Sequence, residues 1–288
     1  MLLNISHKLS EFSYGYGVTR ECEELLVSLG FSVTPFLPSL IHEAEIGCDV
    51  HFDKPGFPLL IQFKLGHELK RFRRSSPSMQ KPTLNSPFWR FEVDTAEPNG
   101  QYDRLLKAEK SGAEVYYIAP KFSNWNDYSF AYKNKRILHE SLIMCPSEIE
   151  NLLQISGQGD GIHKVVYDQN NIAVCSDPTE AQGLTVDAMT SAWRYKLYES
   201  KNASLAKIIN ATLKGFDEYR QIKIYDDLYQ TGNDELIYRI VFREYRDAQK
   251  RLREDLYSRS KTEDDAEFAA LGMEAWELGC QLVAVTKS

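Results

Sequence analysis

The sequence is poor in three features that would each assign a class of function. No apolar run is long enough to cross a membrane, because even the richest stretch, near the C-terminus, is interrupted by Glu274 and Glu277. The five cysteines are scattered, with no C-x-x-C pair and no histidine at zinc-finger spacing. The formal net charge is −7, so the overall field does not attract nucleic acid. We therefore expect a cytoplasmic protein with no membrane contact and with reduced cysteines, in which any phosphate contact comes from a local basic segment.

An alternation of helix and strand patterns runs through the first two thirds of the chain. Helical spacing of apolar residues, strand-like alternation and turn residues predict, in order, a helix at 19–29, strands at 31–36, 48–52 and 59–65, a helix at 102–110, a strand at 115–119, a helix at 148–153 and a strand at 163–167. The turn at residues 53–56 makes the second and third strands a hairpin. The helix at 102–110 and the strand after it indicate an α/β crossover. Residues 66–99, rich in Arg, Lys, Ser and Pro, are predicted to be a long functional loop.

Residues from about 185 onward show a different pattern. Helical spacing dominates there and predicts helices over about 233–259 and 266–285. We therefore expect two domains, one over residues 1–184 and a helical one over residues 185–288. The apolar faces of the last helices are large, so we expect a homodimer or a partner subunit to cover them. Packing of the same faces within one chain is the competing interpretation.

The predicted hairpin sorts its side chains by parity, because neighbouring residues of a strand point to opposite faces. One face is apolar, with Leu59, Ile61, Phe63 and Leu65. Gln62 and Lys64 lie on the other face, and Asp49 can point out of the core on the neighbouring strand. A carboxylate, an amide oxygen and an ammonium group are therefore expected to converge, and these groups suit metal-dependent phosphodiester hydrolysis.

The order of these elements resembles the PD-(D/E)xK nuclease superfamily. The residues that carry the resemblance are Glu21 on the first helix, Gly47-Cys48-Asp49, Gln62-Phe63-Lys64 and the strand at 115–119, within roughly residues 11 to 180. The resemblance implies an α/β (α+β) fold with a restriction-endonuclease-like mixed sheet flanked by helices. It also implies Mg²⁺ or Mn²⁺ as cofactor, bound by Asp49, Gln62 and the Phe63 carbonyl, with Lys64 assisting the attacking water and Glu21 completing the site.

Two positions depart from the family pattern. Cys48 stands where the family has proline, and Gln62 stands where it has an acidic residue. The loss of one negative charge at position 62 weakens metal binding, although branches of the family resembling methyl-directed restriction nucleases use Q-x-K. Gln101, just before the helix at 102–110, is interpreted as a helix-start residue that could face the site.

A concentrated basic segment follows the predicted catalytic strand. We expect it to hold backbone phosphates through Lys70, Arg71, Arg73, Arg74 and Lys81. An ordinary solvated loop is the competing interpretation. The sequence as a whole predicts a magnesium-dependent endonuclease acting on nucleic acid, most simply DNA, with defence against foreign DNA suggested by analogy. The alternative is a catalytically inactive, nuclease-like subunit for nucleic-acid binding or assembly.

Overall fold

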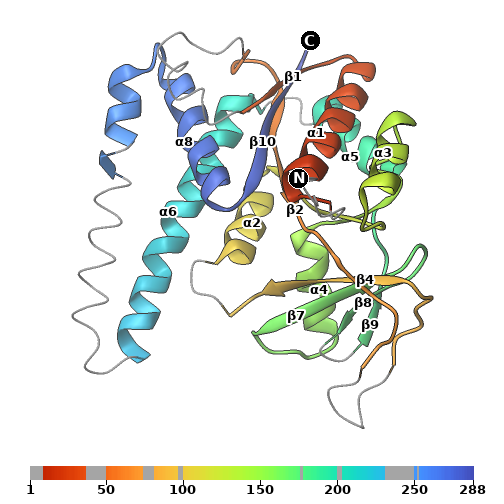
Figure 1. The fold of residues 1–288 in the computed structure, drawn as a ribbon. Helices are drawn as coiled ribbons and strands as arrows, with labels where there is room; N and C mark the ends of the chain where they lie inside the picture. Colours follow the sequence, from red (N-terminus) through yellow and green to blue (C-terminus); the bar gives the residue numbers. More distant parts are fainter. Residues whose placement is uncertain are drawn as a thin grey trace, which may run out of the picture.

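The protein is a mixed α/β molecule built around two five-stranded sheets (Figure 1). The structure, a computed structural model, describes residues 9–36, 50–73, 81–96, 100–175, 178–199, 203–230, 250–251 and 253–288. In that part of the chain, no helix is both long and apolar enough to cross a membrane.

The central sheet has the strand order β1-β10-β2-β5-β6. These strands comprise β1 (Phe31–Pro35), β2 (Gly56–Phe63), β5 (Glu114–Pro120), β6 (Ser141–Met144) and β10 (Cys280–Lys287). β2 and β5 run parallel, and the helix α2 (Gln101–Lys110) lies between them in the chain. The predicted crossover is thus confirmed. The other neighbouring pairs of this sheet are antiparallel, so the sheet is mixed.

Helices cover both faces of the central sheet (Figure 1). On one face, α1 (Glu11–Ser28), α3 (Trp125–Lys133) and α5 (Val186–Glu199) bury apolar side chains against Leu59 and Ile61. On the other face, α2, α6 (Leu205–Gln230) and α8 (Glu263–Glu277) form a second core with Leu60. Alternate residues of β2 therefore face different cores, as the parity of the strand predicts.

The second sheet has the order β3-β4-β7-β8-β9, with all neighbours antiparallel. Its strands are β3 (His67–Leu69), β4 (Phe88–Asp94), β7 (Ile162–Tyr167), β8 (Ile172–Cys175) and β9 (Pro178–Ala181). Together with α4 (Pro146–Ile155), it packs into the same core as α2. The prediction of one long loop over residues 66–99 was wrong at β3 and β4.

Local signals explain where several helices begin and end. Ser10 caps α1 by accepting a hydrogen bond from the Ser13 amide, and Thr262 caps α8 in the same way with Asp265. Gly30, with φ of 84°, ends α1 at the position expected from the sequence. Gly279, with φ of 67°, makes the turn from α8 into β10.

Two element predictions need correction. The helix predicted over 266–285 is helical only as far as Glu277, where α8 ends. The residues after Gly279 form the strand β10 instead. The predicted hairpin is also wrong in its described part, because Val50, His51 and Phe52 form no strand and β2 pairs with β10 and β5. Alternation of Leu282 and Ala284 into one core with Val283 and Val285 into the other is typical of a central strand.

The C-terminal segment contributes to the central sheet, since β10 lies between β1 and β2. The division into two domains near residue 184 means that each part would fold independently, and this stays a prediction. Phe268, Leu271, Leu278 and Leu282 are buried within their own chain, whereas Trp276 is 61% exposed. Packing within one chain thus covers most of the apolar surface of the last predicted helix. Most of the predicted helix over 233–259 lies outside the described residues, and the dimer stays a prediction.

Candidate active site

Gln62 and Lys64 lie at the carboxyl end of β2, where it runs parallel to β5. The Lys64 amide donates to the carbonyl of Ile118 at 3.1 Å, which extends the pairing with β5 by one residue. Carboxyl ends of parallel strands are the usual place for ligand sites in open α/β sheets. The strand pairing therefore brings the Q-x-K residues to an edge suited to chemistry.

The amino group of Lys64 is held by an amide. Its Nζ donates to Oε1 of Gln101 at 2.7 Å and lies 5.8 Å from the centre of the Tyr117 ring. Burial lowers the pKa of Lys64, while Cys280 and Glu11 act in the opposite direction. Because the hydrogen-bond partner is neutral, the ammonium charge of Lys64 remains available to a substrate.

Gln101 connects Lys64 to the C-terminal part of the chain. Its Nε2 donates to the carbonyl oxygen of Leu278 at 2.5 Å, directly before the turn into β10. Gln101 is the first residue of α2, so the interpretation as a helix-start residue is confirmed. Its side chain nevertheless spans from Lys64 to Leu278, which makes it part of the site.

Gln62 is 3% exposed, and both of its polar atoms are engaged. Its Oε1 accepts from the Cys280 thiol at 3.0 Å, and its Nε2 donates to the Phe63 carbonyl at 3.0 Å. Burial raises the pKa of Cys280 to about 12, so this group is a neutral thiol. The hydrogen bond between Cys280 and Gln62 follows from the register of β10 and β2, because the two residues lie opposite each other in this antiparallel pair.

The described oxygen donors do not by themselves fit a magnesium site. Gln62 and the Phe63 carbonyl supply two neutral oxygens, and each already has a hydrogen-bond partner. Within the described ranges, no group of three or more His, Cys, Asp or Glu residues could hold a metal ion. Hard divalent cations favour carboxylate oxygens. The carboxylate predicted for this role, Asp49, lies outside the described residues.

Glu21 has a clear structural contact. Its two carboxylate oxygens accept hydrogen bonds from the backbone amides of Ile137 and Leu138 at 2.8 and 2.9 Å. Burial raises the pKa of Glu21, and these two amides oppose the shift. The carboxylate therefore ties α1 to the segment between α3 and β6, and its predicted support of a metal stays a prediction. Glu11, nearer the start of α1, is the acidic residue that influences the pKa of Lys64.

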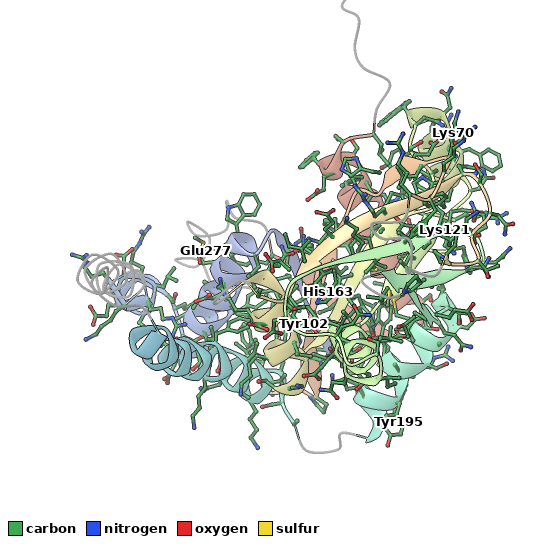
Figure 2. All side chains as sticks on the ribbon, turned by 90° about the horizontal axis from the view of Figure 1, so that it is seen from below. Lys70, Tyr102, Lys121, His163, Tyr195 and Glu277 are labelled. Atoms are coloured by element: carbon green, nitrogen blue, oxygen red, sulfur yellow. The ribbon has the colours of Figure 1, made fainter. Side chains whose placement is uncertain are left out.

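The basic residues of the predicted phosphate-binding segment are exposed where they are described. Lys70, Arg71 and Arg73 directly follow β3, and Lys81 precedes β4. Arg74 lies outside the described residues. Figure 2 shows Lys70 near the upper right edge of the molecule. These side chains are thus free to meet solvent or an anionic partner.

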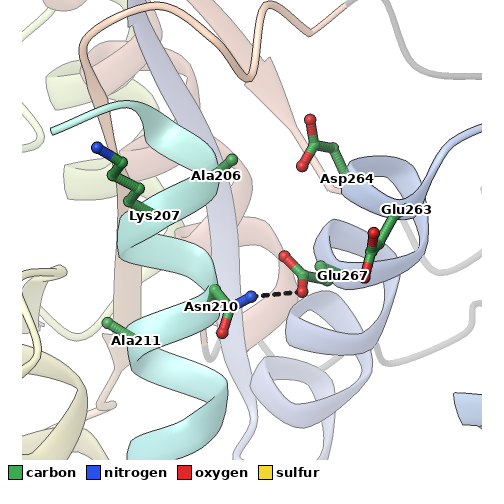
Figure 3. A pocket seen from close by; sticks show the side chains of 7 residues that line it. All are labelled: Ala206, Lys207, Asn210, Ala211, Glu263, Asp264 and Glu267. Atoms are coloured by element: carbon green, nitrogen blue, oxygen red, sulfur yellow. Dashed lines mark hydrogen bonds between the residues drawn. The ribbon is translucent and has the colours of Figure 1, made fainter.

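A separate acidic pocket of about 450 Å³ lies between α6 and α8 (Figure 3). Glu263, Asp264 and Glu267 line it, and Glu267 accepts a hydrogen bond from Asn210 at 2.7 Å. Burial raises the pKa values of Asp264 and Glu267, and neighbouring carboxylates add to the shift. Acidic groups that repel one another do not attract a phosphate, so this pocket is no substrate site for the proposed chemistry.

The chain matches no protein-family model, no curated protein and no solved structure.

Proposed function

We propose that this protein is a nuclease of the PD-(D/E)xK type that hydrolyses phosphodiester bonds in DNA. The observation that supports this most is the placement of Lys64. Its amino group is partly buried, held by the neutral Gln101 at 2.7 Å, and sits beside Gln62 at the carboxyl end of β2. A cation in such a place can bind a non-bridging phosphate oxygen and offset the charge that develops during hydrolysis.

The remaining roles are assigned to groups of this chain. Lys64 binds and orients the scissile phosphate, and Gln101 keeps the lysine in place. Lys70, Arg71 and Arg73 hold backbone phosphates on either side of the scissile bond. Mg²⁺ or Mn²⁺ is the cofactor that the resemblance implies, with Asp49 as the carboxylate it requires. The described donors alone do not form a site for this ion.

A panel of substrates tests the proposal. Purified protein is incubated with supercoiled DNA, linear duplex, single strands and RNA, each with Mg²⁺, Mn²⁺ or EDTA. We expect cleavage of DNA that stops in EDTA and in the Asp49→Ala variant. Absence of cleavage from every substrate with either metal, by a folded protein, would refute a nuclease function.

A second function is favoured by the state of Gln62. Its oxygen accepts from Cys280 and its nitrogen donates to the Phe63 carbonyl, so both polar atoms of the amide already have a partner inside the protein. A nuclease-like subunit that binds nucleic acid without cutting it would show this arrangement. Binding of DNA in the same panel, without cleavage under any condition, would identify this alternative. A role in defence against foreign DNA is a further proposal that depends on the cleavage result.

A further inference from the structure

A row of aromatic rings crosses from α1 to α3. The Tyr16 ring of α1 stacks on Tyr132 of α3, with 6.3 Å between ring centres and 27° between planes. The ring centre of Tyr132 lies 5.8 Å from that of Tyr128, and the ring centre of Tyr128 lies 5.2 Å from that of Trp125. The hydroxyl of Tyr128 donates to the Ser13 carbonyl at 2.6 Å, which fixes the two helices to each other. The rings therefore form one connected row, in which Tyr128 is buried.

Both ends of this row are open to solvent. Tyr16 is 59% exposed and Trp125 is 49% exposed. Phe12, one turn before Tyr16 on α1, is 86% exposed. Single exposed apolar side chains are ordinary, but neighbouring exposed rings over two helices are typical of a binding surface. We call Phe12, Tyr16 and Trp125 the ring surface.

A pocket of about 450 Å³ lies beside the row of rings and is reached through Phe122. Leu9, just before α1, and Phe122 and Ser123, just before α3, form part of its lining. The Phe122 ring lies 6.4 Å from Tyr128, which continues the row into the pocket. Leu65, the residue after Lys64, forms another part of the lining. The pocket thus lies at the same strand end as the candidate active site.

Charge is distributed unevenly around this pocket. Its wall includes His67 and Glu68 of β3, and Glu68 is hydrogen-bonded to Ser123. The basic residues Lys70, Arg71 and Arg73 follow β3 directly. A ligand with uncharged planar groups on one side and phosphates on the other matches this surface, because the rings take the planar groups and the cations take the phosphates.

We propose that the ring surface and the pocket bind a single-stranded stretch of DNA, with bases stacked on Tyr16 and Trp125 and one unpaired base in the pocket against Phe122. In a duplex the base faces are already stacked, so only an unpaired strand can use the rings. The pocket volume of about 450 Å³ lies within the range of about 300 to 1,000 Å³ typical of small-ligand pockets. This inference rests on the proposed function and names the form of its substrate.

The test measures binding without cleavage. Fluorescence anisotropy in EDTA compares a labelled single-stranded DNA with a duplex and with RNA, using the full chain. We expect Tyr16→Ala and Trp125→Ala each to weaken single-strand binding by about fivefold or more, and to leave duplex binding unchanged. Both side chains are about half exposed, so their loss leaves the core intact.

The matched control is Trp276→Ala. Trp276 is another exposed tryptophan, with 61% of its surface accessible, on α8. Helix α8 covers the face of the central sheet opposite to α1 and α3 (Figure 1), so the control removes an equivalent ring from another part of the surface. We expect it to bind single-stranded DNA like the wild type. A loss with Trp276→Ala equal to that with Trp125→Ala would overturn the assignment.

The possible outcomes separate this inference from the proposed function. Ring-dependent binding without cleavage in Mg²⁺ supports the inference and contradicts hydrolysis. Cleavage of DNA by the wild type, together with unchanged single-strand binding in Tyr16→Ala and Trp125→Ala, supports hydrolysis and overturns the inference. Tighter binding of RNA than of single-stranded DNA, or no binding of any oligonucleotide, as expected of a surface that docks a protein, also overturns it.

Discussion

Lys64 Nζ donates to Gln101 Oε1 across 2.7 Å, although the two residues are 37 positions apart in the chain. The same Gln101 side chain donates to the Leu278 carbonyl. An amide side chain can accept from an ammonium group through its oxygen and donate to a carbonyl through its nitrogen at the same time. The end of β2, the start of α2 and the end of α8 are therefore joined at the candidate active site.

Replacement of Gln101 by Ala should lower the rate of cleavage while binding of DNA persists. The amino group of Lys64 would lose the hydrogen-bond acceptor described for it, and small misplacement of a catalytic group costs a large factor in rate. We expect kcat to fall by about tenfold or more with little change in KM. The control is Gln169→Ala, because Gln169 has an exposed side-chain amide whose Nε2 donates to the Lys121 carbonyl. Equal kcat values for Gln101→Ala and the wild type would contradict the role.

Introduction of a carboxylate at position 62 should make stability depend on metal. In Gln62→Glu, a buried carboxylate would face the Phe63 carbonyl that now accepts from the amide nitrogen. We expect a loss of about 1–3 kcal/mol in EDTA, and recovery on addition of Mn²⁺, because a carboxylate is the better ligand for a hard cation. Thermal unfolding with and without Mn²⁺ measures both effects.

The pH dependence of that variant gives a second check. Burial would raise the pKa of the new carboxyl group in the folded state above its unfolded value. Its contribution to stability is then greatest below the unfolded pKa and is lost as pH rises through the folded pKa. Unfolding in EDTA should therefore show Gln62→Glu closest to the wild type in acid. A Gln62→Glu protein that is as stable as the wild type at neutral pH and does not respond to Mn²⁺ would place position 62 outside any metal site.

Glu21→Gln should destabilise the fold without altering cleavage by the folded protein. The amide nitrogen would meet one of the two backbone donors, Ile137 or Leu138, and leave it unpaired, at a cost of about 1–3 kcal/mol. The pKa of Glu21 is raised by burial, so its contribution to stability is present at low pH and is lost as pH rises through the folded pKa. The cost of the substitution should be largest in acid.

Glu24→Gln is the matched control on the same helix. Lys135 and Arg20 lower the pKa of Glu24, and its contribution is therefore present above the unfolded pKa and lost as pH falls. Urea unfolding at several pH values should show opposite trends for the two variants. Parallel trends, or a loss of cleavage in folded Glu21→Gln, would contradict a purely structural role for Glu21.

Glu274→Leu should be strongly destabilising, since Glu274 is 2% exposed and contacts Arg104 of α2 as well as Arg253. Removing the carboxylate leaves buried guanidinium charge, at a cost of about 3–5 kcal/mol. Glu150→Leu, which removes the half-buried partner of the exposed Lys110, should cost about 1 kcal/mol or less. Denaturant midpoints compare the two. Similar losses would show that α8 does not support α2 through this pair.

The parts of the fold that could be predicted from the sequence are those specified by neighbouring residues. The apolar periodicity of α1 ending at Gly30, the alternation through Leu59, Leu60 and Ile61, and the α2 to β5 crossover are all local patterns, and all are confirmed. β3 and β4 escaped prediction because they lie in a segment dominated by Arg, Ser and Pro, where periodicity is weak.

The parts that could not be predicted depend on distant pairing. Gln62 and Cys280 are 218 residues apart, and no local pattern indicates that β10 takes the place beside β2 that a hairpin strand was expected to fill. The apolar run before Val285 suits a helix or a buried strand equally well. Only the turn at Gly279 distinguishes a strand from a continued helix here, and a single glycine is a weak signal. The hydrogen bond from Gln101 to the Leu278 carbonyl could not be predicted either, because it also joins residues that are distant in the chain.

The catalytic role of Lys64 is tested by comparing two lysines at the ends of two adjacent strands. Burial lowers the pKa of both Lys64 and Lys121, and Lys121 Nζ donates to the Gln169 carbonyl at 2.9 Å. The measurement is the rate of plasmid cleavage by Lys64→Met and Lys121→Met in Mg²⁺, each confirmed as folded by circular dichroism. We predict that Lys64→Met abolishes cleavage and that Lys121→Met cleaves at nearly the wild-type rate. Cleavage by Lys64→Met at the wild-type rate would contradict the account.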